Sequence, residues 1–214
     1  REVAQEENAF VLCTLRTRTA QRRAMSDDDE ALFEFARRGK LAGVQELLGR
    51  EVKPDAFLAY DGSSALVIAA RGGHGQVVRL LLERRAALDV HTDDGSSVLV
   101  HAVSGGSAEA VLAVLEAKAD PNEENEDGLT PLILAGEKGG VDVAKLLVEA
   151  KADIAQTAED WGSALDAAMA AGNDELAAYL SACGATPAGK QGGERKVAAG
   201  EQWGYDAFDG EKDY

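Results

Sequence analysis

Histidine is the side chain best suited to general acid–base chemistry near neutral pH, and the chain holds three, His74, His91 and His101. A catalytic triad also needs a nucleophile within hydrogen-bond reach of the ring and a third group that orients it. We expect His91 in a loop and His101 on a helix, and no Cys or Ser stands at a telling distance from either. The sequence therefore predicts no catalytic residues, and we expect a protein that is not an enzyme.

A nucleotide-binding loop is the second chemical possibility. Residues 184–191 come within one residue of the Gly-x-x-x-x-Gly-Lys-Ser/Thr pattern that cradles phosphates. The last position must carry a hydroxyl group for Mg²⁺, and here it is Gln191. The segment also follows an expected helix instead of a strand, and no helix pattern comes after it. We therefore expect no nucleotide cofactor.

Metal sites are also not indicated. Residues 123–128 resemble the start of an EF-hand calcium loop, but the twelfth position, which should be a bidentate Glu, is Leu134. Cys13 and Cys183 lie far apart without a Cys-x-x-Cys pair, which is not the spacing of a zinc site or of a disulfide framework. The sequence predicts no metal and no cofactor, and it favours a reducing compartment.

Negative charge dominates the chain and is unevenly distributed. The net charge is −16, yet residues 1–27 carry +1 and residues 188–214 carry −2, so the middle holds nearly all of it. Such a field repels nucleic acid and anionic membrane surfaces. No window holds 18 to 20 consecutive apolar residues, as a membrane-spanning helix would need. We therefore expect a soluble protein with basic protein partners, no nucleic acid and no membrane insertion.

A repeat with a period of 33 residues organises this middle part. Asp28, Asp61, Asp94, Asp127 and Asp160 are each 33 residues apart, and the same step relates the apolar columns that begin at Phe33, Ala36, Val44 and Leu48. The apolar residues are mostly Ala, Leu and Val, and aromatic residues make up only 5% of the chain. This composition and this period are typical of short helices stacked closely in a solenoid.

Each unit is expected to fold as a turn, a helix, a tight turn and a second helix. In the unit that begins at Asp61, Asp61-Gly62 indicates the turn and Ser64 is placed to cap the first helix. Gly72-Gly73 is expected to end that helix, and a more apolar run over 77–82 indicates the second. Ala69 and Ala70 are small, as expected where neighbouring units approach closely.

These features resemble the ankyrin-repeat family. The motifs are Asp-Gly-Leu-Thr-Pro-Leu at 127–132 followed by Ala135, together with Gly73-His74 and Ala152-Asp153. The resemblance implies an all-α solenoid of five units with β-hairpin-like fingers and a concave face, over residues 28–60, 61–93, 94–126, 127–159 and 160–187. It also implies that the ring of His74 bonds backbone across its turn. Arg85, Lys118 and Lys151 stand where the family usually has Gly, so we expect three residues with positive φ, at a cost of about 1 kcal/mol each.

The family geometry also implies a partner-binding surface made of finger tips and of the exposed ends of the inner helices. An acidic rim is expected along the fingers, with a basic entrance and an exposed Trp161 at the far tip as an interface anchor. The residues expected to bind a partner are Arg37, Arg38, Tyr60, Arg71, Asp93, Asp94, Ser104, Glu126, Glu137, Lys138, Asp160 and Trp161.

Two arms flank the repeats. Residues 1–27 do not begin with Met and contain a basic stretch, residues 14–23, without acids. This stretch fits the remainder of an organellar transit segment or an ordinary extension before Met25, so both the cytoplasm and an organellar stroma or matrix stay open. Residues 188–214 have no helical period, and their acidic-aromatic end is expected either to dock on a neighbour, through Trp203, Tyr205, Phe208 and Tyr214, or to be disordered.

Three functions remain open from the sequence. The first is a non-catalytic accessory or scaffold subunit that uses its acidic fingers, groove and arms in a larger complex. The second is an adaptor or chaperone that transiently binds a basic or apolar segment. The third is a regulatory fragment of a larger enzyme or channel. The sequence does not identify the partner.

Overall fold

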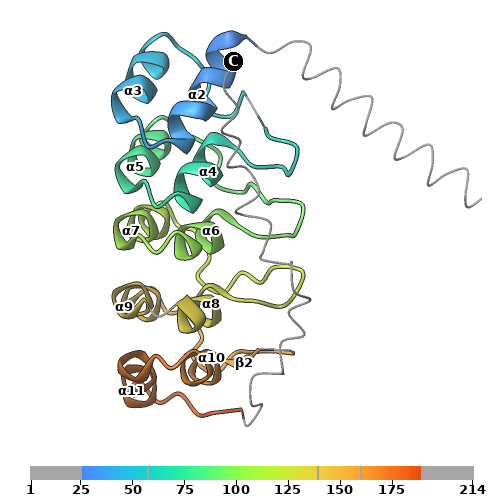
Figure 1. Cartoon of the computed structure of the whole chain (residues 1–214), viewed down its shortest axis with the longest axis vertical. Helices are drawn as coiled ribbons and strands as arrows, with labels where there is room; N and C mark the ends of the chain where they lie inside the picture. The colour runs from blue at the N-terminus through green and yellow to red at the C-terminus, as the bar shows by residue number, and fades with distance from the viewer. Residues whose placement is uncertain (1–25, 57, 139, 160, 189–214) are drawn as a thin grey trace, which may run out of the picture.

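Five helix pairs stack side by side in a computed structural model that describes residues 26–188 except 57, 139 and 160. The inner helices are α2 (Asp27–Arg37), α4 (Ala65–Arg71), α6 (Val98–Ser104), α8 (Pro131–Lys138) and α10 (Ala164–Ala170). The outer helices are α3 (Leu41–Gly49), α5 (Gly75–Glu83), α7 (Ala108–Glu116), α9 (Val141–Glu149) and α11 (Asp174–Ala182). Figure 1 shows the two layers, with the loops between units projecting on one side as fingers. The predicted all-α repeat solenoid is confirmed.

Polar side chains start the inner helices. Ser64 accepts a hydrogen bond from the Val67 amide at 3.3 Å, which confirms its predicted capping role. Thr130 caps α8 in the same way. Ser26 and Ser163 each form a capping box with the Asp three residues later. These caps fix where α2, α4, α8 and α10 begin, whereas Ser97 ahead of α6 makes no side-chain cap; helices of seven to eleven residues have little stability of their own.

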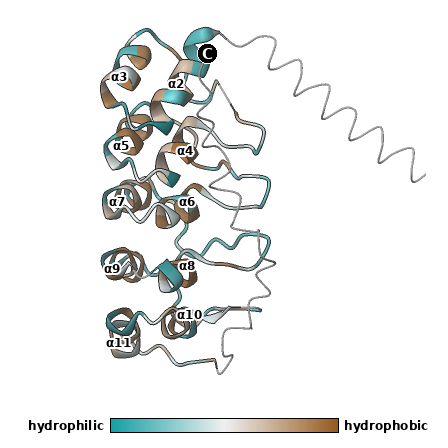
Figure 2. Cartoon of the chain, viewed as in Figure 1, coloured by the Kyte–Doolittle hydropathy of each residue, from teal (hydrophilic) through white to brown (hydrophobic). Residues whose placement is uncertain are grey.

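Apolar side chains between the two layers hold the units together, and Figure 2 shows hydrophobic (brown) stretches on the helices of both layers. Each inner helix buries a leucine at the equivalent position, 32, 66, 99, 132 and 165, and these leucines are at most 4% exposed. The inner helices also approach one another closely. A Cβ atom added to Gly105 would lie 2.5 Å from the carbonyl oxygen of Ala70, and one added to Gly136 would lie 2.5 Å from that of Ala164. Small residues are therefore required at these contacts.

The step between the first two units is one residue longer than predicted. Outer helices start at Leu41, Gly75, Ala108, Val141 and Asp174, so the first step is 34 residues and the others are 33. Leu32, and not Phe33, is thus the equivalent of Leu66, and Leu47 replaces Leu48 in its column. The 33-residue register was wrong for the first unit because the loop between α3 and α4 holds one extra residue.

The outer helices end in residues with positive φ, as the sequence predicted. Arg85, Lys118 and Lys151 have φ of 63°, 74° and 70°, and Glu51 occupies the same place in the first unit with 66°. The next residue closes the turn, since the amide of Ala86 donates to the carbonyl of Leu81 at 3.0 Å. Non-glycine residues are disfavoured in this region, so four turns carry backbone strain.

The two ends of the stack differ from the middle. Helix α2 has 11 residues where α4 has 7, and its extra first turn consists of Asp27, Asp28, Asp29 and Glu30. At the other end, the chain after α11 folds back, and the amide of Ala188 donates to Oδ2 of Asp166 at 2.9 Å. Both ends therefore present polar groups where no further unit follows in the described structure.

Candidate partner-binding surface

The loops between units form four fingers, which we number one to four: residues 52–64, 86–97, 119–130 and 152–163. Together they contain thirteen acidic residues and a single lysine, a net charge of −12 out of −16 for the chain. The helices are therefore close to neutral, and the fingers account for most of the field of the molecule. Phe57 and Asp160 belong to these loops but lie outside the described residues.

Each finger is a short hairpin with a glycine at its tip. Gly62, Gly95 and Gly128 have φ of 80°, 72° and 70°, which the turn requires and which other residues seldom adopt. In the fourth finger, β1 (Thr157–Ala158) pairs antiparallel with β2 (Gly162–Ser163). Single bridges, Leu58 with Ser64 and His91 with Ser97, replace this pairing in fingers one and two.

Backbone hydrogen bonds join neighbouring fingers. The amide of Asp93 donates to the carbonyl of Asp61 at 3.0 Å, and the amide of Glu126 donates to the carbonyl of Asp94 at 3.3 Å. The first three fingers are thus tied into one continuous rim. Asp93 and Glu126, whose amides make these bonds, are both exposed along this rim.

In fingers one and two, the Asp directly before the tip glycine serves the finger itself. The Asp94 carboxylate accepts hydrogen bonds from the Ser96 hydroxyl at 2.8 Å, the Ser96 amide at 3.1 Å and the Thr92 hydroxyl. Asp61 accepts from the Ser63 amide at 3.0 Å and lies 3.5 Å from Nη1 of Arg71. Burial acts to raise the pKa of both carboxyls, but these donors outweigh it and lower the pKa. Asp94, predicted to bind a partner, therefore has a structural role within its finger.

His101 anchors the second finger to α6. Its ring is 1% exposed, and Nε2 lies 2.9 Å from the Thr92 hydroxyl, which also contacts Asp94. Since a hydroxyl has one proton and the short contact to Asp94 takes it, His101 donates from Nε2. Burial first, and then the charge of Arg71, lowers the pKa of His101 to about 4. The nine-residue spacing of this His–Thr pair escaped the sequence analysis.

This His–Thr pair lacks the geometry of a catalytic dyad. The Thr92 proton is directed at Asp94 and not at the ring, so the ring cannot accept it as a general base would. The adjacent hollow between α6, α8 and finger three has a volume of only about 30 Å³. That is the space of about one water molecule, so no substrate fits beside the pair.

The predicted basic entrance is partly neutralised. Arg37 and Arg38 are exposed at the end of α2, but both contact the carboxylate of Glu34, with Nε of Arg37 at 2.8 Å. The hydrogen bond from Arg37 leads the effects that lower the pKa of Glu34. Arg71 lies against Asp61, as described above. The cationic character at this end of the groove is therefore weaker than the sequence suggested.

The other predicted positions on the inner helices vary in exposure. Ser104 and Glu137 are half-buried and Lys138 is exposed, and all three line the 30 Å³ hollow. The small residues beside them serve the fold, because Gly105 faces the Ala70 and Arg71 carbonyls of the preceding unit. Packing between units therefore explains the small residue at position 105.

Among the finger residues that the structure describes, the exposed aromatic side chain is at the opposite end from the predicted one. Trp161 is partly buried and packs against the core, so the prediction of an exposed tryptophan anchor was wrong. Tyr60 on finger one is 80% exposed, and Leu58 beside it is 52% exposed. Leu58 was missed although its repeat column carries a signal, since the equivalent positions hold His91, Glu124 and Thr157, which are polar and exposed. The predicted tail residues Trp203, Tyr205, Phe208 and Tyr214 lie outside the described residues.

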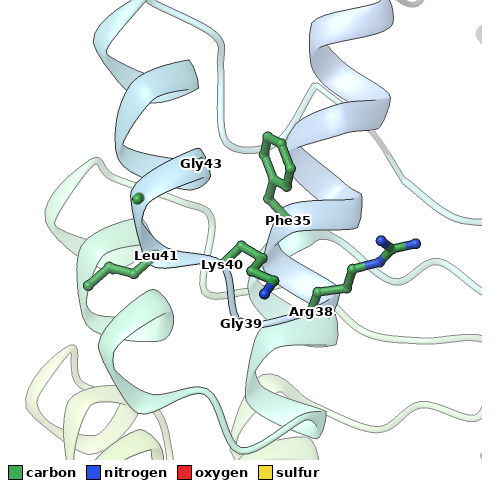
Figure 3. A pocket seen from close by; sticks show the side chains of 7 residues that line it. Phe35, Arg38, Gly39, Lys40, Leu41 and Gly43 are labelled. Carbon is green, nitrogen blue, oxygen red and sulfur yellow. The ribbon is translucent and has the colours of Figure 1, made fainter.

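A shallow hollow opens at the first turn, between α2 and α3. It has a volume of about 480 Å³ and a mostly apolar lining, and Figure 3 shows Arg38 and Lys40 at its edge beside Phe35. The Phe35 ring fills the space over Gly43, where an added Cβ atom would lie 2.6 Å away. No carboxylate, hydroxyl or thiol group lines this hollow, so the Lys40 amine has no second acid–base or nucleophilic group beside it in the lining.

Within the described ranges, no three His, Cys, Asp or Glu side chains form a group that could hold a metal ion. None of the helices described in the structure is long and apolar enough to cross a membrane. Comparison with protein families gives one further finding: a family model for ankyrin repeats (three copies) matches residues 32–125 and 113–190.

Proposed function

Because this chain belongs to the ankyrin-repeat family, whose domains are protein–protein interaction modules, we propose that it is a non-catalytic accessory or scaffold subunit that binds a basic segment of a partner protein along its acidic finger rim. The rim consists of the exposed tip residues of fingers one to three, which the backbone hydrogen bonds described above join. The partner would lie across several fingers, since solenoids present extended surfaces and not a single pocket.

The segregation of charge carries this proposal. Thirteen carboxylates and one lysine on the fingers stand against near-neutral helices. A general need for solubility would spread negative charge over all faces. A one-sided row of like charges lowers the stability of the fold through mutual repulsion, and a basic partner relieves that repulsion. The regular spacing from finger to finger also sets the distances at which the positive charges of a partner segment must follow one another.

The structure narrows the residues that would meet the partner. Asp93, Glu126 and Asp127 are exposed at neighbouring tips, whereas Asp61 and Asp94 hold their own fingers together. Tyr60 and Leu58 offer exposed apolar area at the first finger. The partner segment is therefore basic over most of its length and apolar at one end. Aromatic residues with a polar tip, such as Tyr60, are frequent interface anchors.

Charge reversal tests the proposal with a matched control. Residues 1–214 serve as bait, and zero-length carbodiimide cross-linking couples carboxylates to partner lysines in direct contact. The cross-links should include Glu126 and Asp127. The triple variant with Asp93→Lys, Glu126→Lys and Asp127→Lys should lose the partner.

The control variant carries Glu83→Lys, Glu116→Lys and Glu149→Lys. These residues end the outer helices α5, α7 and α9, so the net charge changes equally on the opposite layer. Lysine is favourable at a helix C-terminus, and the fold should tolerate the change. If the control loses the partner as completely as the finger variant, net charge and not the rim is responsible.

Salt dependence separates a stable subunit from a transient adaptor. Contacts between exposed charges weaken as the Debye length shortens, to about 3 Å at 1 M ionic strength. A subunit with additional apolar contacts at Leu58 and Tyr60 should stay bound at high salt. Release at moderate salt, with rapid exchange of partner, would favour the adaptor.

A further inference from the structure

The finger rim changes character along the stack. Finger one exposes Leu58 and Tyr60, 52% and 80% respectively, whereas fingers two and three expose Asp93, Glu126 and Asp127. A segment that fits this rim therefore needs an apolar group at the first finger and cations beyond it. The order of one apolar group followed by cations, and not the acidic row alone, identifies the segment that fits the rim.

The chain enters the fold at the apolar end of the rim. Helix α2 packs along α4, and its extra first turn, Asp27–Glu30, occupies the place where α4 is preceded by finger one. Inner helices of one stack lie about 8–10 Å apart. Ser26, the cap of α2, therefore stands about one helix spacing from the base of finger one.

The residues that lead into Ser26 have the required order. Counting back from Ser26, the chain has the apolar residues Met25 and Ala24, and then four arginines at positions 23, 22, 18 and 16. No acidic residue occurs between positions 8 and 26. Three finger-to-finger steps span about 30 Å at this helix spacing. Ten extended residues reach about 33 Å, so residues 16–25 are long enough to follow the rim.

We propose that residues 16–25 dock on the finger rim of their own chain, with Met25 against Leu58 and Tyr60 and the four arginines along Asp93, Glu126 and Asp127. Arginine pairs with carboxylates through two parallel hydrogen bonds and stacks on aromatic rings, so it suits both parts of the rim. The attachment at Ser26 gives the segment an effective concentration of the order of millimolar.

This inference rests on the proposed function in one respect, namely that the same carboxylates meet the partner. The basic arm then occupies the rim until a partner displaces it, which makes binding selective for partners that compete with an intramolecular segment. Arm and partner share one surface, so the arm also keeps the acidic fingers of the free protein neutralised.

Cys13 provides a probe three residues before Arg16. With Cys183→Ser, residues 1–214 carry a single thiol, to which a nitroxide spin label is attached. The label broadens NMR signals of nearby amides. The tip glycines Gly95 and Gly128 should broaden strongly, and Gly49 and Gly75 on the outer helices should not. The broadening should vanish in a variant with Arg16→Gln, Arg18→Gln, Arg22→Gln and Arg23→Gln.

A matched control removes the same charge elsewhere. Lys190→Gln, Arg195→Gln, Lys196→Gln and Lys212→Gln take four positive charges from residues 189–214 and should leave the broadening unchanged. Equal broadening on both layers, or broadening that survives the four N-terminal changes, would overturn the docking. Mixing isotope-labelled protein with spin-labelled unlabelled protein tests the in-cis assignment, which broadening between copies would refute.

The outcome is independent of the partner experiment. The spin-label measurement uses the free protein, so its failure leaves partner binding by the rim untouched. Conversely, if no partner were found to bind the rim, the expected contact between residues 16–25 and the fingers would be unaffected.

Discussion

Nε2 of the His74 ring lies 3.0 Å from the backbone carbonyl oxygen of Arg37. His74 precedes the outer helix of the second unit and Arg37 ends the inner helix of the first, so this contact joins two units. Nδ2 of Asn173 donates to the Gly136 carbonyl at 3.0 Å, with the same separation of 37 residues. The carbonyls at the C-terminal end of an inner helix have no partner inside the helix, and these side chains satisfy them from the next unit.

Replacing His74 should therefore weaken the first interface. His74→Ala removes the hydrogen bond and the packing of the ring on Gly39, and should lower the free energy of unfolding by about 1–2 kcal/mol. His74→Asn should retain much of the stability, because Asn173 makes the equivalent contact. Urea denaturation of the three proteins checks this. Equal losses in both variants would show that ring packing, and not the hydrogen bond, holds the interface.

Relieving the strain in a turn should raise the free energy of unfolding, whereas the His74 substitutions should lower it. Lys118 has a φ of 74°, where glycine is favoured, so Lys118→Gly should raise the free energy of unfolding by about 0.5–1 kcal/mol. Its neighbour Ala117 has a φ of −74°, and Ala117→Gly should destabilise the fold by a similar amount. Thermal denaturation of both variants compares them. A drop in Tm for Lys118→Gly would mean that the side chain makes contacts that outweigh the strain.

The sequence was sufficient to predict the repeat, the cap at Ser64 and three of the four strained turns, because each depends on position within a repeat unit. Ser64 and Lys118 are examples, since the cap and the positive φ follow from position within a unit. The extra residue before α4 was missed because Asp28 and Asp61 keep the 33-residue step by coincidence. Asp28 is in the extra turn of α2, and Asp61 is in a finger, so the two are not structurally equivalent.

The candidate site was less predictable because exposure depends on tertiary contacts. Trp161 and Tyr60 occupy neighbouring positions of the finger pattern, yet one packs on the core and the other is exposed. Asp93 and Asp94 are adjacent in sequence, and only the hydrogen bonds around Ser96 reveal that Asp94 serves its own finger. Sign and location of charge could be predicted, but not which carboxylates the fold itself uses.

The close approach of α4 and α6 should make Gly105 intolerant of any side chain. A Cβ atom there would lie 2.5 Å from the Ala70 carbonyl oxygen and 2.8 Å from that of Arg71, and both are backbone atoms that cannot rotate away. Gly105→Ala should cost about 1–3 kcal/mol, typical of overpacking. Gly49, with nothing within 4 Å of an added Cβ, is the control, and Gly49→Ala should be neutral or stabilising. Similar effects of both would contradict the predicted clash.

The buried ring of His101 should make stability depend on pH above the range where carboxylates titrate. Its pKa in the folded state is lowered to about 4, against an unperturbed value of 6.5, first because of burial. As pH falls below 6.5, His101 becomes protonated in the unfolded chain but stays neutral in the folded chain, so stability is lost down to about pH 4. At pH 5 this loss amounts to about 2 kcal/mol relative to neutral pH. The pKa values of Asp61 and Asp94 are lowered, so these groups titrate below this window.

His101→Leu should remove this dependence. The equivalent residues of the neighbouring units are Ile68 and Leu134, so an aliphatic side chain fits the position, and the Thr92 hydroxyl keeps its hydrogen bond to Asp94. Urea denaturation at pH 7.5 and 5 should show a loss for the original chain that is about 2 kcal/mol greater than for the variant. His91→Gln, at an exposed histidine that contacts Glu123, is the control and should keep the loss attributed to His101. A variant with the same pH dependence as the original chain would place the titrating group elsewhere.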